Sequence, residues 1–434
     1  MIKTGRNCHG RDSLWLPSTM GGQFVEDLHL SLKEGKGLWA TDDKGISYLD
    51  ANSGLWHLSL GYGPSPVANA VYEAAYRIGG CSLFRRTHDW ANSLASEITG
   101  KVKLKSDGRV LFTTSGSEAA DTAMRIALAY HDQLDRRYFA YVRGAYHGVS
   151  IGPLSLMGIE GYHNGLPPAI PAIELPSYRT WEEDEESTRS YLRELFKLRG
   201  HQIAAVFIEP IQGSGGVLRI PDSYAAELQR LIFESKTLLV VDEVACGTGR
   251  AGKLAYYVSY EVLAPDMVLL GKGLTAGISA LSAVIVEDPV MAAVIGTPHL
   301  NRLPGTTHSG NPVSCAAAIT TLRILEGSDQ TELQSAASTW LDRSLQSMLS
   351  FETVKAVRGW GHMWGVEVEV EAIPVIGNRT WVDTVTTAAL RHQLLIHPLS
   401  IGVIPIFPAL IASTAEVSEI AKRLAAAFLE LGSD

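Results

Sequence analysis

Residues 238–252 read LLVVDEVACGTGRAG, and residues 266–275 read DMVLLGKGLT. In each stretch a run of apolar residues leads into a charged residue, which is Asp242 in the first and Lys272 in the second. Apolar residues in succession, rather than in alternation, are typical of strands buried on both faces of a parallel sheet. The two stretches therefore predict two buried strands, one followed by a carboxylate and the other by a lysine.

Similar strand-like runs occur on both sides of this region and alternate with helical patterns. The expected strands cover residues 110–114, 139–144, 204–210 and 281–286, and the expected helices cover 118–131 and 224–235. Such alternation predicts an α/β core with right-handed crossovers. Ligands of these sheets bind beyond the carboxyl ends of the strands, so the residues that follow each strand are the candidate site.

The pattern changes in the last quarter of the chain to amphipathic helices around a few strands. We expect helices over 316–325, 333–349 and 415–431 and a strand over 365–371. This change of pattern predicts a large domain over 51–320 and a small C-terminal domain over 321–434. Residues 1–50 are expected to pack against the small domain. The acidic run 182–186 is expected to be a solvated loop before a helix that starts near Ser187.

Composition excludes several classes of function. The chain has 434 residues and a formal net charge of −9 at pH 7, which argues against nucleic acid or an anionic membrane as the main partner. No run approaches 18 apolar residues and none resembles a signal peptide, so we expect no membrane span. The scattered cysteines Cys8, Cys81, Cys246 and Cys315 suit a reducing cytoplasm.

The first two strand ends carry small and aromatic residues. Ser115-Gly116-Ser117 follows the strand at 110–114 and opens a helix, where free N–H groups can bind a phosphate. Taken alone, Ser117 could equally be a plain helix cap. Tyr146 and His147 follow the strand at 139–144, where an aromatic ring could stack on a planar ligand.

The remaining strand ends carry charges that need partners. Glu209 and Asp242 require a cation, a metal or a protonated heterocycle nearby. A metal is disfavoured because neither has a histidine or second aspartate at ligand spacing. Lys272, between Gly271 and Gly273, is a candidate for Schiff-base chemistry. Pyridoxal phosphate unites these features, with a phosphate cradle at 115–117, Tyr146 over its ring, Asp242 at its ring nitrogen and Lys272 at its aldehyde.

One motif favours another class of enzyme. Residues 247–252, GTGRAG, match the GxGxxG pattern of dinucleotide-binding proteins. The match does not begin at the strand end, and its candidate acid, Asp266, would itself begin the next strand. An NAD(P)-dependent oxidoreductase is therefore a remote alternative. The chain contains no GxSxG or HExxH motif to support a hydrolase.

The chain resembles the class III, fold-type I pyridoxal-phosphate aminotransferases over most of its length. The matching motifs include YLDANSGLWHLSLGYGPSP, TSGSEAADTAMRIALAYH, FIEPIQGSGG, LVVDEVACGTGRAGK, GKGLTAGISALSAVIV and GTTHSGNPVSCAAA. The forms DEV-x-CG-x-GR-x-G and KGLT-x-G are most similar to the ω-transaminase branch. The resemblance implies a large domain with a mostly parallel central sheet flanked by helices, plus a smaller α/β domain.

The resemblance also implies roles for individual residues. Lys272 would form the Schiff base and then shuttle the substrate proton, and Asp242 would pair with the pyridine nitrogen. Tyr146 would lie in front of the ring and Val244 behind it. The other implied contacts are Ser115, Gly116, Ser117, His147 and Glu209 for the cofactor, Trp56 for the substrate, and Thr307 for the phosphate of the partner subunit in a homodimer.

One departure from the family pattern concerns the substrate. Family members that act on α-carboxylates or ω-amino acids usually carry a late arginine, whereas this chain has His397-Pro398 there. Smaller departures are His308, where an aromatic is usual, and Ala120, where asparagine is usual. Without a bidentate arginine, a substrate carboxylate could be met elsewhere, with Arg85, Arg86 and Arg143 as candidates.

The interpretation we favour is that the main substrate has no carboxylate near the reacting carbon. It would be an amine, an amino alcohol, an amino sugar or the modified end of a larger molecule, with a carbonyl partner such as a keto acid. An aminomutase or a decarboxylase of the same fold stays open, because the cofactor contacts are shared among these enzymes.

Overall fold

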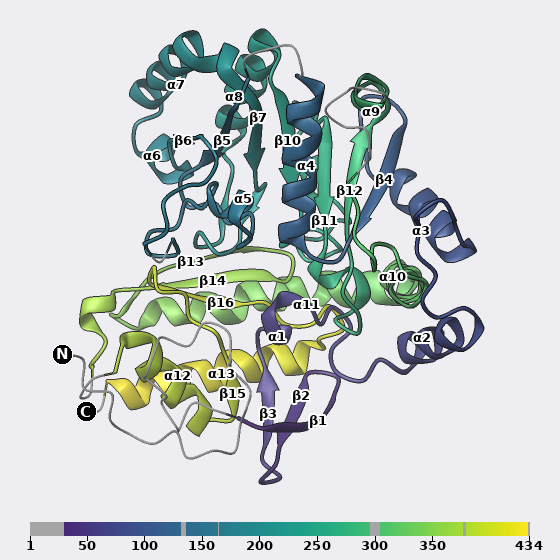
Figure 1. Cartoon of the computed structure of the whole chain (residues 1–434). Coiled ribbons are helices and arrows are strands. Elements are labelled where there is room, and N and C mark those ends of the chain that lie inside the picture. The colour runs from purple at the N-terminus through teal and green to yellow at the C-terminus, as the bar shows by residue number, and fades with distance from the viewer. Residues whose placement is uncertain (1–29, 132–135, 164, 296–303, 376–378, 433–434) are drawn as a thin grey trace, which may run out of the picture.

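The computed structural model describes residues 30–131, 136–163, 165–295, 304–375 and 379–432. Its centre is a seven-stranded sheet in the order β4-β12-β11-β10-β7-β5-β6 (Figure 1). The strands are β4 (Gly108–Thr113), β5 (Tyr138–Val142), β6 (Ala172–Leu175), β7 (Ile203–Ile208), β10 (Leu238–Asp242), β11 (Met267–Leu270) and β12 (Ser282–Glu287). Every residue of β7, β10, β11 and β12 is buried, and all are apolar except Asp242, Ser282 and Glu287 at the strand ends.

The sheet is mostly parallel, which confirms the expected fold class. The pairs β5–β6, β5–β7, β7–β10 and β10–β11 are parallel, whereas β12 is antiparallel to both β11 and β4. Because β12 runs in reverse, its first residue, Ser282, lies at the edge where its neighbours end. Hydrophobicity alone does not distinguish a buried antiparallel strand from a parallel one.

Helices cover both faces of this sheet. One face packs against α4 (Gly116–Tyr130) and α9 (Asp288–Val294), and the other against α3, α7, α8 and α10. Along β10, Val240 belongs to the first layer and Val241 to the second, because successive side chains of a strand point to opposite faces. The helices of the second face are α3 (Asp89–Thr99), α7 (Glu185–Arg199), α8 (Asp222–Ser235) and α10 (Pro312–Leu325).

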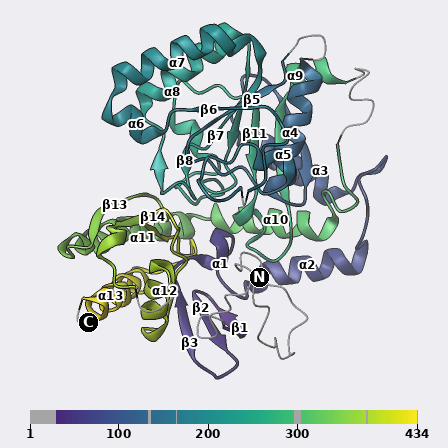
Figure 2. The same ribbon diagram turned by 60° about the vertical axis from the view of Figure 1, so that its left-hand side comes forward.

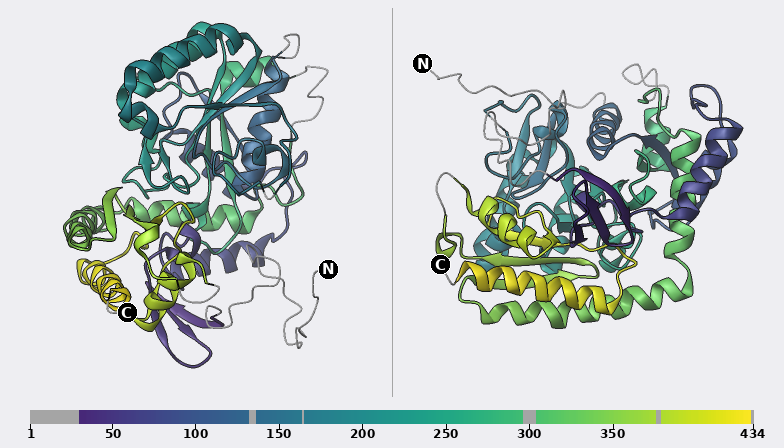
Figure 3. Two further views of the ribbon diagram at one scale, coloured as in Figure 1. Left: turned by 90° about the vertical axis from the view of Figure 1, so that its left-hand side faces the viewer. Right: turned by 90° about the horizontal axis from the view of Figure 1, so that it is seen from below.

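A second core lies below the large sheet in the view of Figure 1 and joins both ends of the chain. It is built on β13 (Val354–Trp360), β14 (Met363–Val368) and β16 (Val403–Ile406), with α11 (Ser328–Gln346), α12 (Trp381–Arg391) and α13 (Thr414–Leu431). Helices α11 and α13 lie side by side (Figure 3). Strands β1 (Leu32–Lys36), β2 (Trp39–Asp42) and β3 (Ser47–Asp50) form a further sheet with β15 (Leu394–Leu395).

The second core contains Leu38 and Leu49 from the N-terminal strands together with Val366 and Leu424 from the C-terminal part. Within the expected N-terminal segment, residues 30–50 are described and contribute to this core, whereas residues 1–29 lie outside the described residues. Helix α10 runs across residue 320, so the expected boundary falls inside a helix. The division at residues 50 and 320 stays a prediction.

The remaining elements are short or lie on the outside. They are α1 (Ser53–Trp56), α2 (Ser65–Arg77), α5 (Ile151–Leu154), α6 (Tyr178–Glu183), β8 (Ile211–Gln212) and β9 (Leu218–Arg219). Short 3₁₀ turns cover Gly200–Gln202, Tyr256–Ser259, Lys272–Thr275, Ser347–Ser350 and Val370–Ala372. Across the described ranges, no helix combines the length and the apolar character that a membrane span needs.

Residues 182–186 are exposed, as expected, but the expectation that they form a loop is wrong. Helix α6 continues to Glu183, and Asp184 caps α7 by accepting a hydrogen bond from the backbone N–H of Ser187 at 3.1 Å. Glu185 and Glu186 occupy the first turn of α7. Carboxylates are stabilising at this end of a helix because the dipole and the free N–H groups there are positive.

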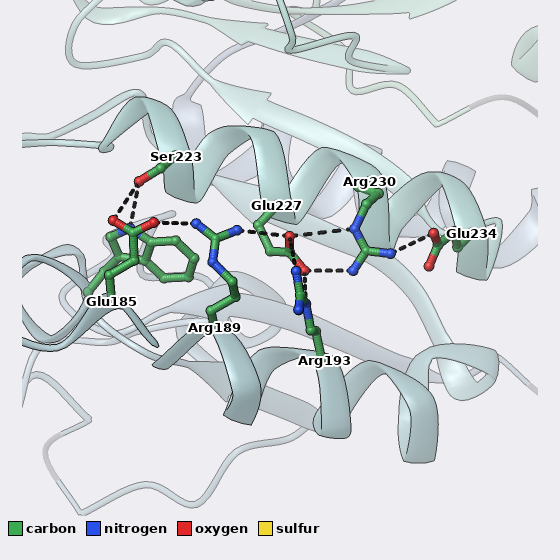
Figure 4. A network of polar contacts seen from close by, with 8 residues as sticks. Glu185, Arg189, Arg193, Ser223, Glu227, Arg230 and Glu234 are labelled. Carbon is green, nitrogen blue, oxygen red and sulfur yellow. Dashed lines mark hydrogen bonds and ion pairs between the residues drawn. The ribbon is translucent and has the colours of Figure 1, made fainter. Parts of the chain in front are cut away.

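Helices α7 and α8 lie side by side (Figure 2) and are joined by an ion-pair network centred on Glu227. The Glu227 carboxylate accepts hydrogen bonds from Arg189 at 3.0 Å, Arg193 at 2.8 Å and Arg230 at 2.6 Å. Glu185 and Glu234 pair with the outer arginines (Figure 4). The hydrogen bonds from Arg193 and Arg230 outweigh burial and lower the pKa of Glu227 to about 2.

We expect Glu227→Gln to lower the free energy of unfolding by about 1–3 kcal/mol at pH 7, because a side chain only 4% exposed loses charge-assisted bonds. The folded pKa lies below the ordinary value, so this stabilisation is present above about pH 4.5 and is lost as the pH falls towards 2. Urea unfolding at pH 7 and pH 4 measures both effects. The control Glu194→Gln removes an exposed pair with Lys197 and should change stability little. Equal effects of the two substitutions would contradict the prediction.

Candidate active site

A cavity of about 430 Å³ opens where the strands of the large sheet end. Its size lies in the range of small-molecule sites. It brings together residues that the sequence places far apart and that were predicted to act together. These are Trp56, Ser115, Gly116, Ser117, Tyr146, His147, Glu209, Asp242, Val244 and Lys272.

One wall of the cavity is the first turn of α4. Ser115 caps this helix by accepting a hydrogen bond from the N–H of Glu118 at 3.2 Å. The N–H groups of the next residues, Gly116 and Ser117, have no acceptor within the helix. Ser117 instead accepts from the N–H of Val149 at 3.0 Å, which ties the helix start to the loop after β5. This turn therefore presents free N–H donors of the kind that bind a phosphate.

Three glycines make room beside this wall. A Cβ on Gly148, whose φ is +127°, would lie 2.5 Å from Oγ of Ser117. A Cβ on Gly116 would lie 3.1 Å from Cγ1 of Val244, and a Cβ on Gly271 would lie 3.2 Å from the same atom. The side chain of Val244 therefore packs closely against Gly116 and Gly271 and lines the cavity.

Asp242 lies at the end of β10 and is 4% exposed. Its carboxylate accepts from the backbone N–H of Val244 at 3.0 Å and faces Nδ1 of His147 at 2.8 Å. The opposite ring atom, Nε2 of His147, is buried without a hydrogen-bond partner among the described residues. Because a carboxylate has about four acceptor positions, Asp242 can accept a further hydrogen bond from a ligand.

Glu209 joins the loops after β5 and β7. Its carboxylate accepts from the N–H of Tyr146 at 2.9 Å and from the N–H of Gly213 at 3.3 Å. Burial raises the pKa of Glu209 to about 7, and the charge of Asp242 acts in the same direction while His147 opposes it. Through these two hydrogen bonds Glu209 fixes the backbone of Tyr146 and links it to the loop at Gly213.

Lys272 begins the 3₁₀ turn after β11 with a left-handed backbone, φ 41°. Its Nζ makes no hydrogen bond or ion pair with the described residues, and it lies 5.2 Å from the ring centroid of Trp56. Burial lowers the pKa of Lys272, while Asp242 and Glu209 partly oppose this effect. A lysine with a lowered pKa carries more of the neutral amine, which is the nucleophilic form.

Trp56 lines the cavity, and residues outside the cavity hold its side chain and backbone in place. Its ring packs against Phe407 with a centroid distance of 4.7 Å. The buried Arg250 donates to the carbonyl of Trp56 at 3.4 Å and to Oγ of Ser53 at 2.9 Å. Gly213 lies directly against the ring, since a Cβ there would be 2.9 Å from Cζ3. Arg250 belongs to the segment 247–252, which forms turns after β10 rather than a dinucleotide-binding helix.

Several predicted site residues lie outside this cavity. Thr307 and His397 are exposed and do not line it, and the same holds for Arg85, Arg86 and Arg143. Arg143 pairs with Glu174 at 2.7 Å. The backbone N–H of His397 lies 2.6 Å from the Asn52 side chain when that amide presents its oxygen, and Asn52 does not line the cavity either. Of the two departures noted, His308 is exposed and Ala120 is buried against the sheet.

The cavity also contains residues that sequence analysis did not single out. They are His57, Thr114, Ser214, Ala245 and the segment Thr275, Gly277, Ser279, Ala280, Leu281 and Ser282. Thr114, Ser214 and Ala245 lie one to five residues from predicted site residues, so their neighbourhood was a usable signal. The segment 275–282 reaches the cavity because β12 is antiparallel, which the sequence did not reveal.

The match to a family model decides the classification. The model of the class III aminotransferases matches residues 22–428. The chain belongs to the class III aminotransferases. The sequence resemblance is thereby confirmed, and the enzyme is a pyridoxal-phosphate-dependent aminotransferase, because that cofactor serves this family.

Curated relatives agree with this assignment. The chain is 31% identical to the uncharacterized aminotransferase YhxA of Bacillus subtilis over 85% of this chain and 83% of the relative. It is 30% identical to the diaminobutyrate–2-oxoglutarate transaminase of Halomonas elongata over 90% of this chain and 88% of the relative. Both relatives are named for amino transfer, which favours this reaction over the aminomutase, decarboxylase and oxidoreductase alternatives.

Solved structures share the fold of this aminotransferase. An aminotransferase from Vibrio fluvialis in its PMP-bound form gives a TM-score of 0.87 at 27% identity, with 96% of this chain and 97% of that chain covered. An amine transaminase from an uncultivated Pseudomonas species in its PLP-bound form gives a TM-score of 0.86 at 27% identity, covering 98% and 100%. The expected α/β architecture with its large central sheet is confirmed.

Proposed function

We propose that this aminotransferase takes its amino group from an amine that has no carboxylate beside the reacting carbon. The second substrate is a carbonyl compound such as a keto acid, whose carboxylate also meets no arginine among the described cavity residues and is therefore expected to bind weakly. The observation that carries the proposal is the charge of the cavity, since no arginine is found among the described residues that line it. Arg85, Arg86 and Arg143 are exposed and lie outside it. A carboxylate would therefore lack the bidentate partner that usually recognises it.

The residues present fit pyridoxal phosphate. The free N–H groups of Gly116 and Ser117 would hold its phosphate, with the cap of Ser115 fixing the helix start. Val244 and Tyr146 would lie on the two sides of its ring, with Tyr146 held by Glu209 and Asp242 braced by His147. The fit rests on the glycine-lined space beside Val244 and on the unpaired amine of Lys272.

When bound, pyridoxal phosphate supplies an electron-accepting ring that stabilises negative charge on the substrate carbon after its proton is removed. The carboxylate of Asp242 would keep a proton on the ring nitrogen. The Nζ of Lys272 would carry the cofactor, be displaced by the donor amine, and then accept the proton from the substrate carbon. Trp56 would exclude water from the substrate side of the cavity.

Two donors that differ only in a carboxylate test the proposal. We expect isopropylamine to discharge the yellow holoenzyme at least about 10-fold faster than alanine, because the alanine carboxylate would lose its hydration in a cavity that holds Glu209 and Asp242 and no arginine among its described lining residues. The measurement is the rate at which the visible band disappears in a single turnover without acceptor. Faster discharge by alanine would contradict the proposal.

A gain of function provides the second arm of this test. His397→Arg should improve alanine relative to isopropylamine, because the backbone of residue 397 adjoins Asn52, four residues before Trp56. The matched control is His201→Arg, which adds the same charge at an exposed position outside the cavity. An unchanged preference in His397→Arg would count against this position as the missing carboxylate contact.

We also propose a homodimer in which Thr307 of one subunit reaches the cofactor phosphate of the other. Support comes from the exposed aromatic side chains of Tyr72 and Tyr76, which are 73% and 82% exposed, and of Phe84, which is 57% exposed. A Cβ on Gly305 would lie 3.6 Å from the Phe84 ring, so the exposed loop with Thr307 adjoins this face. A solution mass of one chain, 46.9 kDa, would contradict this assembly.

The cytoplasm is the proposed location. Cys81, Cys246 and Cys315 are free thiols, and Cys246 and Cys315 are fully buried. Free thiols are usual in a reducing compartment. Recovery of the protein outside the cytoplasmic fraction of its cells would overturn this assignment.

A further inference from the structure

The residue after Trp56 is a histidine that lines the same cavity as Lys272 and Asp242. His57 is half-buried, and its position in the cavity follows from the turn at Ser53–Trp56, where Ser53, Gly54 and Trp56 all have positive φ. A positive φ costs energy for residues other than glycine, so the surrounding contacts must hold this turn in place. The aminotransferase chemistry described above assigns His57 no role.

The imidazole of His57 lies between two glycines. A Cβ on Gly54, φ 68°, would lie 2.5 Å from Cε1 of His57, and a Cβ on Gly277, φ 78°, would lie 2.8 Å from Cδ2. Two glycines therefore flank the ring from separate segments of the chain. A Cβ at either position would meet the imidazole, so the ring lies directly against both glycines.

The hydrogen bonding of the ring fixes its tautomer. Nδ1 of His57 accepts a hydrogen bond from the backbone N–H of Leu55 at 3.0 Å. An acceptor nitrogen cannot carry a proton, so in the neutral ring the proton lies on Nε2. Nε2 makes no hydrogen bond with the described residues. Burial lowers the pKa of His57, and the charge of Lys272 acts in the same direction while Asp50 opposes both. The ring is therefore a neutral donor with a free N–H group.

We propose that His57 is a specificity-determining residue whose Nε2–H donates a hydrogen bond to an uncharged oxygen of the substrate. The substrate class is then an amine with an ether, hydroxyl or amide oxygen in its side chain. This inference rests on the proposed function, because it concerns the same cavity and the same amine donors. The hydrogen bond from His57 would add an attractive contact with the substrate in a cavity that has no arginine among its described lining residues.

The test compares two amines that differ by one atom. 1-Methoxy-2-propylamine and 2-aminopentane have the same shape, with an ether oxygen in the first where the second has a methylene group. The measured quantity is the ratio of the second-order rate constants with which the two amines make the visible band of the yellow holoenzyme disappear in a single turnover. A neutral hydrogen bond contributes about 0.5–1.5 kcal/mol, so His57→Leu should lower the ratio of ether to hydrocarbon about 3- to 10-fold.

Two further variants separate hydrogen bonding from shape. His57→Gln keeps an N–H donor and should retain part of the preference for the ether, and His201→Leu, which changes an exposed histidine outside the cavity, should leave it unchanged. If His57→Leu fails to bind the cofactor, His57→Phe serves as the apolar variant for the same ratio. An unchanged ratio in the apolar variant, with both amines still reacting, overturns the inference alone. Failure of both amines with the unaltered holoenzyme overturns the proposed function as well.

Discussion

Lys272→Ala should abolish amino transfer, with a fall in kcat of at least about 1,000-fold. The side chain has two tasks that no neighbour can take over. It is the only lysine among the described residues that line the cavity, and its amine makes no ion pair that would hold it in the charged form. Burial lowers its pKa, which makes the amine available as a nucleophile and afterwards as a base.

The measurements for Lys272→Ala are the steady-state rate with an amine donor and the visible spectrum of the purified protein. We expect the variant to keep its fold, because alanine removes a cation from a buried position. The control is Lys253→Ala at an exposed lysine in the turn before the 3₁₀ segment at Tyr256. Normal activity in Lys272→Ala, or equal losses in both variants, would contradict the assigned role.

Asp242→Asn should lower kcat about 100- to 1,000-fold, which is the effect of removing a fixed charge from a site where charge develops. The substitution keeps the shape of the side chain and its bond to the N–H of Val244. It removes the negative charge that would hold a proton on the ring nitrogen of the cofactor. Asp242→Glu keeps the charge and should therefore retain more activity than Asp242→Asn.

A cofactor analogue distinguishes loss of charge from loss of structure. Asp242→Ala loaded with pyridoxal phosphate that is methylated at the ring nitrogen carries a permanent positive charge there. This complex should recover part of the lost rate. The control Asp43→Asn changes an exposed aspartate outside the cavity and should have no effect on kcat. If the methylated cofactor gives no recovery and His147 has moved in the variant, Asp242 acts by holding His147 rather than by its charge.

The sequence was sufficient to predict most of the cavity residues that follow the strand ends. Strands β7 and β11 are apolar throughout and β10 is apolar up to Asp242, as strands buried on both faces should be, so the first polar residue marks the end of each strand in the sequence. Glu209, Asp242 and Lys272 were found in this way, and all three line the cavity. The position of a polar residue directly after a buried strand was enough to predict these three cavity residues.

Other residues of the cavity were less predictable because tertiary contacts place them there. His57 enters the cavity through a strained turn that Arg250 and Phe407 hold from a distance in the sequence. Ser282 reaches the cavity because β12 runs antiparallel to β11. The sequence of a short buried strand does not indicate in which direction the strand runs. His397, in contrast, was placed near the substrate by resemblance, yet its side chain is exposed and does not line the cavity.

The attachment point of the cofactor is the most direct test of this site. The purified protein, loaded with pyridoxal phosphate and reduced with borohydride, is digested and its peptides are analysed by mass spectrometry. The reduced cofactor should be found on Lys272, in the peptide that contains Gly271-Lys272-Gly273. Label on a different lysine, or no label on any lysine, would contradict the assignment of this cavity as the active site.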